Sequence, residues 1–271
     1  MMSHRLDLAA RTEKGRQRAT NEDTFLIADL ATGARHGPMP VRTELASANG
    51  VALAVVDASG SGFFAATTGA ELAAEAMRHA LTGAPSASKL PLALRAASAA
   101  IVAEMNDDPT REQRAAATLA VIASDSVHLA HIGGTRAYLL ESGGLRRLTR
   151  DDTLAADAVA RSHRLDFGPV GDGTLVPTRW LGAKSTHVED AVDSLELRGG
   201  DTLLLSTVGL HLVLDDAMIE RVLGAHSDPG AACDALYDAA MRAGGPFNIS
   251  IVVARQVTAA ARRDHLHQAT Q

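Results

Sequence analysis

The stretch "ATLAVIASDSVHLAHIGGTRAYLL" (117–140) decides the fold class, because it holds three short apolar runs in close succession. The runs are "TLAVIA" (118–123), "VHLAHI" (127–132) and "TRAYLL" (135–140). Each is rich in branched residues and bounded by Gly, Asp or Ser, which indicates a β-strand. The connections are too short for crossovers, so the stretch predicts an antiparallel meander, and "SGGL" (142–145) predicts a turn that continues it.

The other apolar runs fall into two kinds. Short runs predict further strands at "VALAVV" (51–56), "TLLLS" (202–206) and "ISIVV" (249–253). Long Ala-rich segments, with apolar residues at spacings of three and four, predict helices over 63–81, 90–105 and 230–244. Strands and helices come in blocks rather than in strict alternation. The sequence therefore predicts an α+β fold with antiparallel sheets and helices packed outside.

No composition shift divides the chain of 271 residues, which is long enough to bury a sizeable core without covalent staples. We expect one domain over residues 1–256, in which 31–50 and 161–177 are loops. Residues 257–271 are expected to form a flexible C-terminal tail.

Charge and cysteine content exclude several classes of protein. Lys and Arg total 26 and Asp and Glu 32, a formal net charge of −6, and no basic stretch indicates a nucleic-acid groove. The single cysteine, Cys233, rules out an internal disulfide and fits a reducing compartment. Neither a signal peptide nor a membrane span is evident, so we expect a cytoplasmic protein that binds neither nucleic acid nor membrane.

Carboxylates at strand ends are the first candidates for chemistry. Asn21, Glu22 and Asp23 directly precede an apolar strand, and Asp57 ends the 51–56 run before a turn of Ser and Gly. Converging carboxylates are the usual ligands of Mg²⁺ and Mn²⁺. Taken alone, the same residues are equally typical of a solvated strand entry.

A further pattern resembles the metal-dependent Ser/Thr protein phosphatases of type 2C, the PPM family. Its segments keep the family's order from about residue 8 to about 256: "GRQRATNEDTF" (15–25), "LAVVDASGSG" (53–62), 117–154, "GGDTLLLSTVGL" (199–210) and "GGPFNISIVVA" (244–254). The resemblance implies an α-β-β-α sandwich of two antiparallel sheets flanked by helices. It also implies two metal ions in a cleft, whose shared water attacks the phosphorus of a phosphoserine or phosphothreonine.

Matched residue by residue, the resemblance implies that part of this site is retained. Arg18 falls on the arginine that binds the substrate phosphate, Glu22 on a metal-ligating glutamate and Asp23 on its supporting aspartate. Asp57 falls on the aspartate that bridges both metals. Ala58 replaces a glycine whose carbonyl binds one metal, and it must tolerate the backbone angles that glycine allowed.

Three other ligand positions are lost. Gly134 in "GGTR" replaces an aspartate of an additional metal site, and Val208 in "STVGL" and Phe247 in "PFNIS" replace two metal-ligating aspartates. Glu22, Asp57 and the Ala58 carbonyl would serve one metal, whereas apolar side chains surround the other. Since a hard divalent cation needs roughly six oxygens, we expect at most one weakly held Mg²⁺ or Mn²⁺ ion, or none.

The sequence therefore predicts a pseudophosphatase that binds or restrains a phosphoprotein, a Ser/Thr kinase or an active phosphatase, with no confidently assigned catalytic residue. Two alternatives stay open. The site could be rebuilt from Asp151, Asp152 or a histidine, which would give a weak Mn²⁺- or Mg²⁺-dependent Ser/Thr phosphatase. The fold could instead serve only as a structural or scaffold domain.

Overall fold

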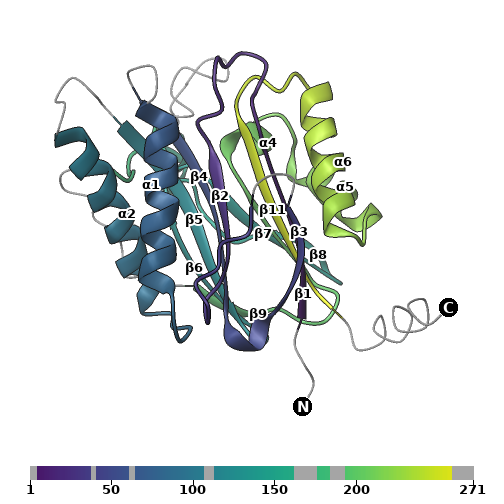
Figure 1. Ribbon diagram of the computed structural model, residues 1–271. Helices are drawn as coiled ribbons and strands as arrows, with labels where there is room; N and C mark the ends of the chain where they lie inside the picture. The colour runs from purple at the N-terminus through teal and green to yellow at the C-terminus, as the bar shows by residue number, and fades with distance from the viewer. Residues whose placement is uncertain are drawn as a thin grey trace.

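The computed structural model describes residues 5–37, 41–60, 65–106, 113–161, 176–183 and 193–257. Two antiparallel sheets pack face to face, with α1 and α2 outside one sheet and α5 and α6 outside the other (Figure 1). This arrangement confirms the predicted α+β sandwich. None of the described helices is both long and apolar enough to span a bilayer.

The first sheet has the strand order β3-β1-β11-β10-β7-β8. Its strands are β3 (Val41–Ala46), β1 (Arg5–Glu13), β11 (Ile249–Gln256), β10 (Thr202–Ser206), β7 (Arg136–Glu141) and β8 (Gly144–Arg147). The short α4 (Val208–His211), α5 (Asp216–Ala225) and α6 (Pro229–Arg242) cover its outer face. Leu204, Leu236 and Ile251 are fully or almost fully buried between the helices and this sheet.

The second sheet has the order β2-β4-β5-β6-β9. Its strands are β2 (Thr24–Asp29), β4 (Val51–Gly60), β5 (Gln113–Ala123), β6 (Ser126–Ile132) and β9 (Asp193–Glu196). Its outer face packs against α1 (Ala65–Leu81) and α2 (Lys89–Asn106). A 3₁₀ turn, η1 (Ser47–Asn49), leads into β4, and α3 (Leu154–Ala160) follows β8.

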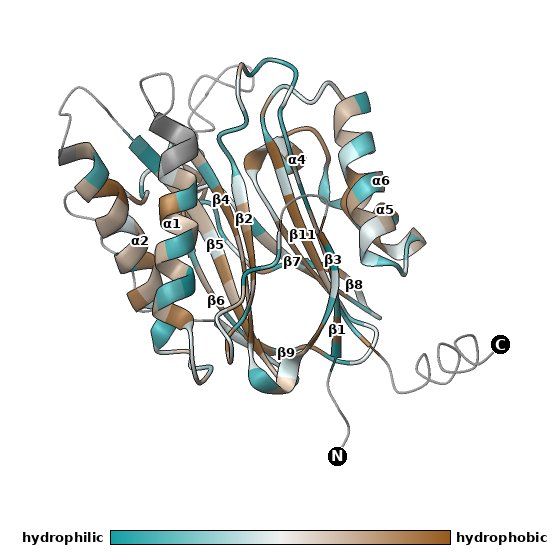
Figure 2. Ribbon diagram, in the orientation of Figure 1, coloured by the Kyte–Doolittle hydropathy of each residue, from teal (hydrophilic) through white to brown (hydrophobic). Residues whose placement is uncertain are grey.

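Strand β4 shows why its apolar run has no polar face. Ala52, Ala54 and Val56 pack toward α1 and α2, whereas Leu53 and Val55 pack into the layer between the sheets. Successive strand residues point to opposite faces, so a strand covered on both sides must be apolar at every position. In Figure 2 the inner strands of the sheets are largely brown, the colour of hydrophobic residues.

The predicted meander is wrong at one connection. β5 pairs with β6 and β7 with β8, as expected, but β6 and β7 lie in different sheets. Gly133 allows the crossing, since it has φ +94° and a Cβ there would lie 2.4 Å from the Ala116 Cβ. A side chain at this position would be excluded by both the backbone conformation and the contact.

Two further boundaries differ from the sequence prediction. The expected loop 31–50 contains β3, an edge strand that pairs with β1 on one side. Its charged residues, Arg42 and Glu44, interrupt the apolar run by which a strand is recognised in the sequence. β4 continues through the expected Ser-Gly turn to Gly60. Most of the predicted loop 161–177 and the predicted tail, from residue 258 onward, lie outside the described residues.

Candidate functional site

The pairing of β2 with β4 brings the retained carboxylates together. Thr24 is the register partner of Val56, so Asp23 and Asp57 lie at the same end of neighbouring strands. Asp57 and Glu22 both act electrostatically on Asp23. The structure thus gathers the acidic residues that the resemblance matched from two separate segments.

Burial is the main cause that raises the pKa of Asp57 to about 6. The Val208 amide and the Arg18 charge oppose this rise, and the Glu22 charge adds to it. Burial, followed by the charge of Asp57, also raises the pKa of Asp23 well above its usual range, against a hydrogen bond from Thr207. The two carboxyl groups therefore resist carrying two full negative charges.

A hydrogen-bonded chain fixes Asp23 in this site. Thr207 Oγ1 donates to Asp23 Oδ2 over 2.7 Å and accepts from the Ser250 amide over 2.9 Å. This chain joins the entry of β2 to the loop after β10 and to β11. Asp23 is thus linked through Thr207 to the backbone of Ser250.

The loops that carry Arg18 and Phe247 are packed backbone to backbone. A Cβ at Gly15 would lie 2.1 Å from the Phe247 carbonyl oxygen, and the Gly15 amide donates to Asn248 Oδ1 over 3.3 Å. The Arg18 guanidinium carbon lies 4.7 Å from the centroid of the Phe247 ring, a cation–π contact. These contacts hold the side chains of Arg18 and Phe247 next to each other.

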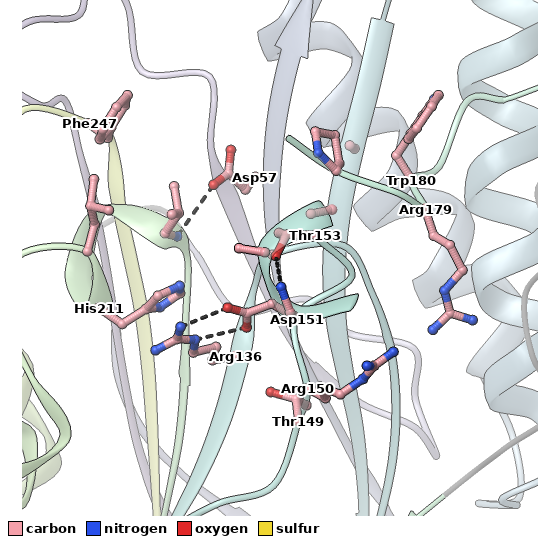
Figure 3. Close-up of a pocket in the computed structure, with 18 of the residues that line it drawn as sticks. Asp57, Arg136, Thr149, Arg150, Asp151, Thr153, Arg179, Trp180, His211 and Phe247 are labelled. Carbon is pink, nitrogen blue, oxygen red and sulfur yellow. Dashed lines mark hydrogen bonds and ion pairs between the residues drawn. The ribbon is translucent and has the colours of Figure 1, made fainter. Parts of the chain in front are cut away.

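Two of the replaced positions face Asp57 and Arg18 directly. Val208 begins α4, and its backbone amide donates to Asp57 Oδ2 over 3.4 Å (Figure 3). Phe247 presents its ring to Arg18. Among the described residues, no group of three or more His, Cys, Asp or Glu side chains is placed to hold a metal ion. The donors present do not fit a pair of divalent ions.

Ala58 lies inside β4 as the register partner of Ala115. The expected difficulty with its backbone angles does not arise, because Ser124 is the one non-glycine residue with positive φ in the described part of the chain. Gly134 lines the cleft, as Arg136 does, and a Cβ added to Gly134 would meet no atom within 4 Å.

Asp151 and Asp152 are held by arginines. Asp151 forms a two-point ion pair with Arg136, at 2.9 and 2.7 Å, and a further contact of 2.5 Å with Arg147. Asp152 accepts from Arg179 over 2.7 Å and from the Gly133 amide over 2.8 Å. These contacts argue against a metal site rebuilt from either carboxylate.

Two histidines near this region, His131 and His211, have lowered pKa values. Burial lowers the pKa of His211 well below its usual value, with the charges of Arg136 and Arg147 acting in the same direction. Burial also lowers the pKa of His131, whose Nδ1 lies 3.0 Å from Thr118 Oγ1. Neither histidine belongs to a metal-binding group within the part of the chain that the structure describes.

These residues border a cleft of about 890 Å³ that runs from Phe247 to Trp180 (Figure 3). Its charged lining comprises two carboxylates, Asp57 and Asp151, and six arginines: Arg18, Arg114, Arg136, Arg147, Arg150 and Arg179. Sequence reasoning missed five of these arginines, because they are scattered over four segments of the chain. Three follow threonine, in "TR" pairs at 135–136, 149–150 and 178–179, which was the one available signal.

The chain is similar to bacterial Ser/Thr phosphatases, although no family model matches it. It is 32% identical over 260 residues to the serine/threonine protein phosphatase PstP of Mycobacterium tuberculosis, which covers 92% of this chain and 45% of that protein. It is 26% identical over 140 residues to the phosphatase stp of Listeria innocua, which covers 49% and 53%. The chain spans about half the length of these curated relatives.

Solved structures show the same architecture. The M. tuberculosis phosphatase PstP/Ppp superposes with a TM-score of 0.77 at 28% identity, covering 94% of this chain and all of that one. The PstP catalytic domain in complex with two manganese ions has a TM-score of 0.76 at 28% identity, with the same coverage. The S. agalactiae serine/threonine phosphatase, at 18% identity, shares the fold with a TM-score of 0.79 over 93% of this chain and 100% of that chain.

Proposed function

Since the chain belongs to the PPM-type Ser/Thr phosphatase family, we propose that it is a non-catalytic member, a pseudophosphatase that binds a phosphorylated protein. The partner would be a phosphoprotein, a Ser/Thr kinase or an active phosphatase. The observation that carries this proposal is the pair Val208 and Phe247, which face Asp57 and Arg18 where ligating carboxylates are expected.

The chemistry of hard cations supports this assignment. Mg²⁺ and Mn²⁺ prefer oxygen donors, and neither an isopropyl group nor a phenyl ring supplies one. A two-metal phosphatase needs both ions, because together they activate the attacking water and stabilise the leaving oxygen. With the second position apolar, efficient hydrolysis is not expected.

Arg18 is the proposed phosphate contact. It is exposed at the edge of the cleft, and the packing of its loop on residues 245–248 fixes its backbone. A guanidinium group donates two parallel hydrogen bonds to a phosphate, which suits recognition without hydrolysis.

A second candidate function is weak metal-dependent hydrolysis with one ion. Glu22 and Asp57 are both retained and interact electrostatically, so they are the residues that would hold a single Mg²⁺ or Mn²⁺ ion. This alternative needs a nucleophilic water activated by one cation instead of two.

Calorimetric titration with Mn²⁺, together with p-nitrophenyl phosphate turnover, separates these functions. The variant Asp57→Ala removes the central carboxylate. Glu220→Ala, an exposed glutamate on α5 outside the cleft, is the matched control.

We expect no turnover above that of the Asp57→Ala variant, with or without Mn²⁺, and retained binding of a phosphothreonine peptide. Turnover that needs Mn²⁺ and disappears in Asp57→Ala, but not in Glu220→Ala, would establish the second function instead. Absence of both turnover and peptide binding would leave a scaffold role.

A further inference from the structure

The charge of the cleft is opposite to that of the chain. The whole sequence carries 26 Lys and Arg against 32 Asp and Glu, whereas the cleft carries six arginines against two carboxylates. Guanidinium groups are permanently charged and match the geometry of phosphate oxygens. The lining of the cleft is therefore rich in guanidinium groups, and two of them, Arg179 and Arg150, pair with carboxylates outside the lining, Asp152 and Asp157.

In the middle of the cleft, one carboxylate forms ion pairs with two arginines. Asp151 pairs with Arg136 and Arg147 at once, so two guanidinium groups share one counter-charge. Their side chains are only 18% and 29% exposed, which limits screening by water. This cluster retains a net positive charge beside the remnant site.

An arginine lies on an aromatic ring at each end of the cleft. Arg18 lies on Phe247 at 4.7 Å, and Arg114 lies on Trp180 at 4.9 Å. Figure 3 shows the two rings on opposite sides of the cleft. The Phe247 ring lies against the plane of the Arg18 guanidinium, and the N–H donors of a guanidinium point outward along the edge of that plane.

At the Phe247 end, the Arg18 guanidinium is the cation that acts on the two buried carboxylates. The residues present do not fit two divalent ions, yet the Arg18 charge acts on both Asp57 and Asp23, the carboxylates that a cation would otherwise neutralise. Phe247, in the place of a ligating aspartate, is the residue that supports Arg18 there.

We propose that this cleft binds a phosphothreonine or phosphoserine peptide without any divalent cation, with Arg18 at the phosphate and the arginine-lined cleft supplying the charge that metals supply in related enzymes. This proposal rests on the proposed function, and it adds that phosphopeptide binding does not require a metal ion. The apolar side chains of Val159 and Trp180 at the far end would receive residues that flank the phosphate.

The test uses the full chain and a fluorescein-labelled phosphothreonine peptide with leucine and glutamate flanks. Anisotropy gives its dissociation constant in EDTA and in excess MnCl₂, and chromatography of the same samples detects hydrolysis. The unphosphorylated peptide measures how much the flanking residues contribute to binding. Inorganic phosphate, added as a competitor, measures how much the phosphate group contributes.

We expect the same dissociation constant in EDTA and in MnCl₂. Arg18→Gln should weaken binding about tenfold or more, because a charge-assisted contact is lost. The control Arg221→Gln, an exposed arginine on α5, should leave binding unchanged. Arg18→Lys, which keeps the charge but not the planar fork, should recover part of the affinity.

Binding that appears only with MnCl₂ would overturn metal independence and leave phosphopeptide binding standing. Hydrolysis in MnCl₂ would overturn the non-catalytic function but not metal-free binding, if that is seen in EDTA. Absence of binding under both conditions, or equal binding of the unphosphorylated peptide, would contradict both proposals.

Discussion

The backbone amide of Val208 donates to Asp57 Oδ2 over 3.4 Å, so a peptide group contacts the carboxylate that a metal pair would share. This contact comes from the first residue of α4, where amides lack partners within the helix. At this position of the loop "STVGL", the backbone of Val208 supplies the polar contact to Asp57.

Placing carboxylates at two of the three lost positions, Val208 and Phe247, should create a metal-dependent protein. In Val208→Asp/Phe247→Asp, two added carboxylates would crowd Glu22, Asp23 and Asp57, and the loss of the ring would release Arg18. We expect a lower melting temperature in EDTA that Mn²⁺ raises again, since ligand binding to the native state stabilises it.

Calorimetry with Mn²⁺ should show binding to the double variant that exceeds binding to the wild type. The control is the double variant Val208→Asn/Phe247→Leu. Asn and Leu are close to Asp in size and carry no charge, so this variant changes the packing without adding carboxylates. If the double variant gains no affinity for Mn²⁺, the assignment of these two positions to a metal site is wrong.

Asp57 should weaken the fold at neutral pH. Its pKa is raised from 3.8 to about 6, so the folded state holds this proton more tightly than the unfolded state does. Its contribution to stability is complete below about pH 4 and is lost as the pH rises to about 6. Asp57→Asn keeps an acceptor for the Val208 amide and removes the titration.

The variant should therefore be more stable than the wild type at pH 7.5, by up to about 3 kcal/mol, and this gain should vanish below about pH 4. Urea denaturation of both proteins across this range gives the difference. A difference that does not vary with pH would show that burial does not govern this carboxyl group.

The sequence predicted the fold well where side chains alternate in and out of the core. The runs around Leu53, Leu204 and Ile251 were correctly predicted as strands. A strand buried on both faces is apolar at nearly every position, and this pattern is easy to recognise. The edge strand β3 was missed, since "VRTELA" buries only its first residue. The crossing at Gly133 was missed because a short Gly-Gly connection is also typical of a hairpin.

The candidate site was predictable only as far as its motifs extend. Asp23, Asp57 and Arg18 lie in matched segments, and the structure brings them together. The arginine-lined cleft could not be predicted, because Arg114, Arg147 and Arg179 come from distant segments and form no basic run. Only the tertiary packing of the sheet edge and the residues around α3 places their charges side by side.

Gly15 should be essential for the position of Arg18. An added methyl group would lie 2.1 Å from the Phe247 carbonyl oxygen, so Gly15→Ala must separate the two loops. We expect a loss of about 2 to 3 kcal/mol in the free energy of unfolding, as for other overpacked sites. Phosphopeptide binding should weaken as well, because the loops also carry Arg18 and Phe247.

Gly224→Ala is the matched control, since nothing lies within 4 Å of its added Cβ on α5. This variant should be unchanged or more stable by up to about 1 kcal/mol, because alanine is the better helix former. Equal urea midpoints for the two variants would refute the close approach of the loops.

Asp151 should act as the internal counter-ion of the cleft. Asp151→Asn removes the charge shared by Arg136 and Arg147, whose guanidinium groups then face each other without a carboxylate. Breaking a fully buried pair costs about 3 to 5 kcal/mol, and water in the open cleft reduces this to about 2 kcal/mol.

An external anion should then take over the role of the lost carboxylate. Sulfate should raise the melting temperature of Asp151→Asn more than that of the wild type, when compared with chloride at equal ionic strength. Glu141→Gln breaks the exposed pair with Arg146 and should lose less than about 1 kcal/mol, without a specific sulfate effect. Equal rescue by sulfate and chloride would mean that the arginines do not form an oxyanion site, because general screening alone would then account for the gain.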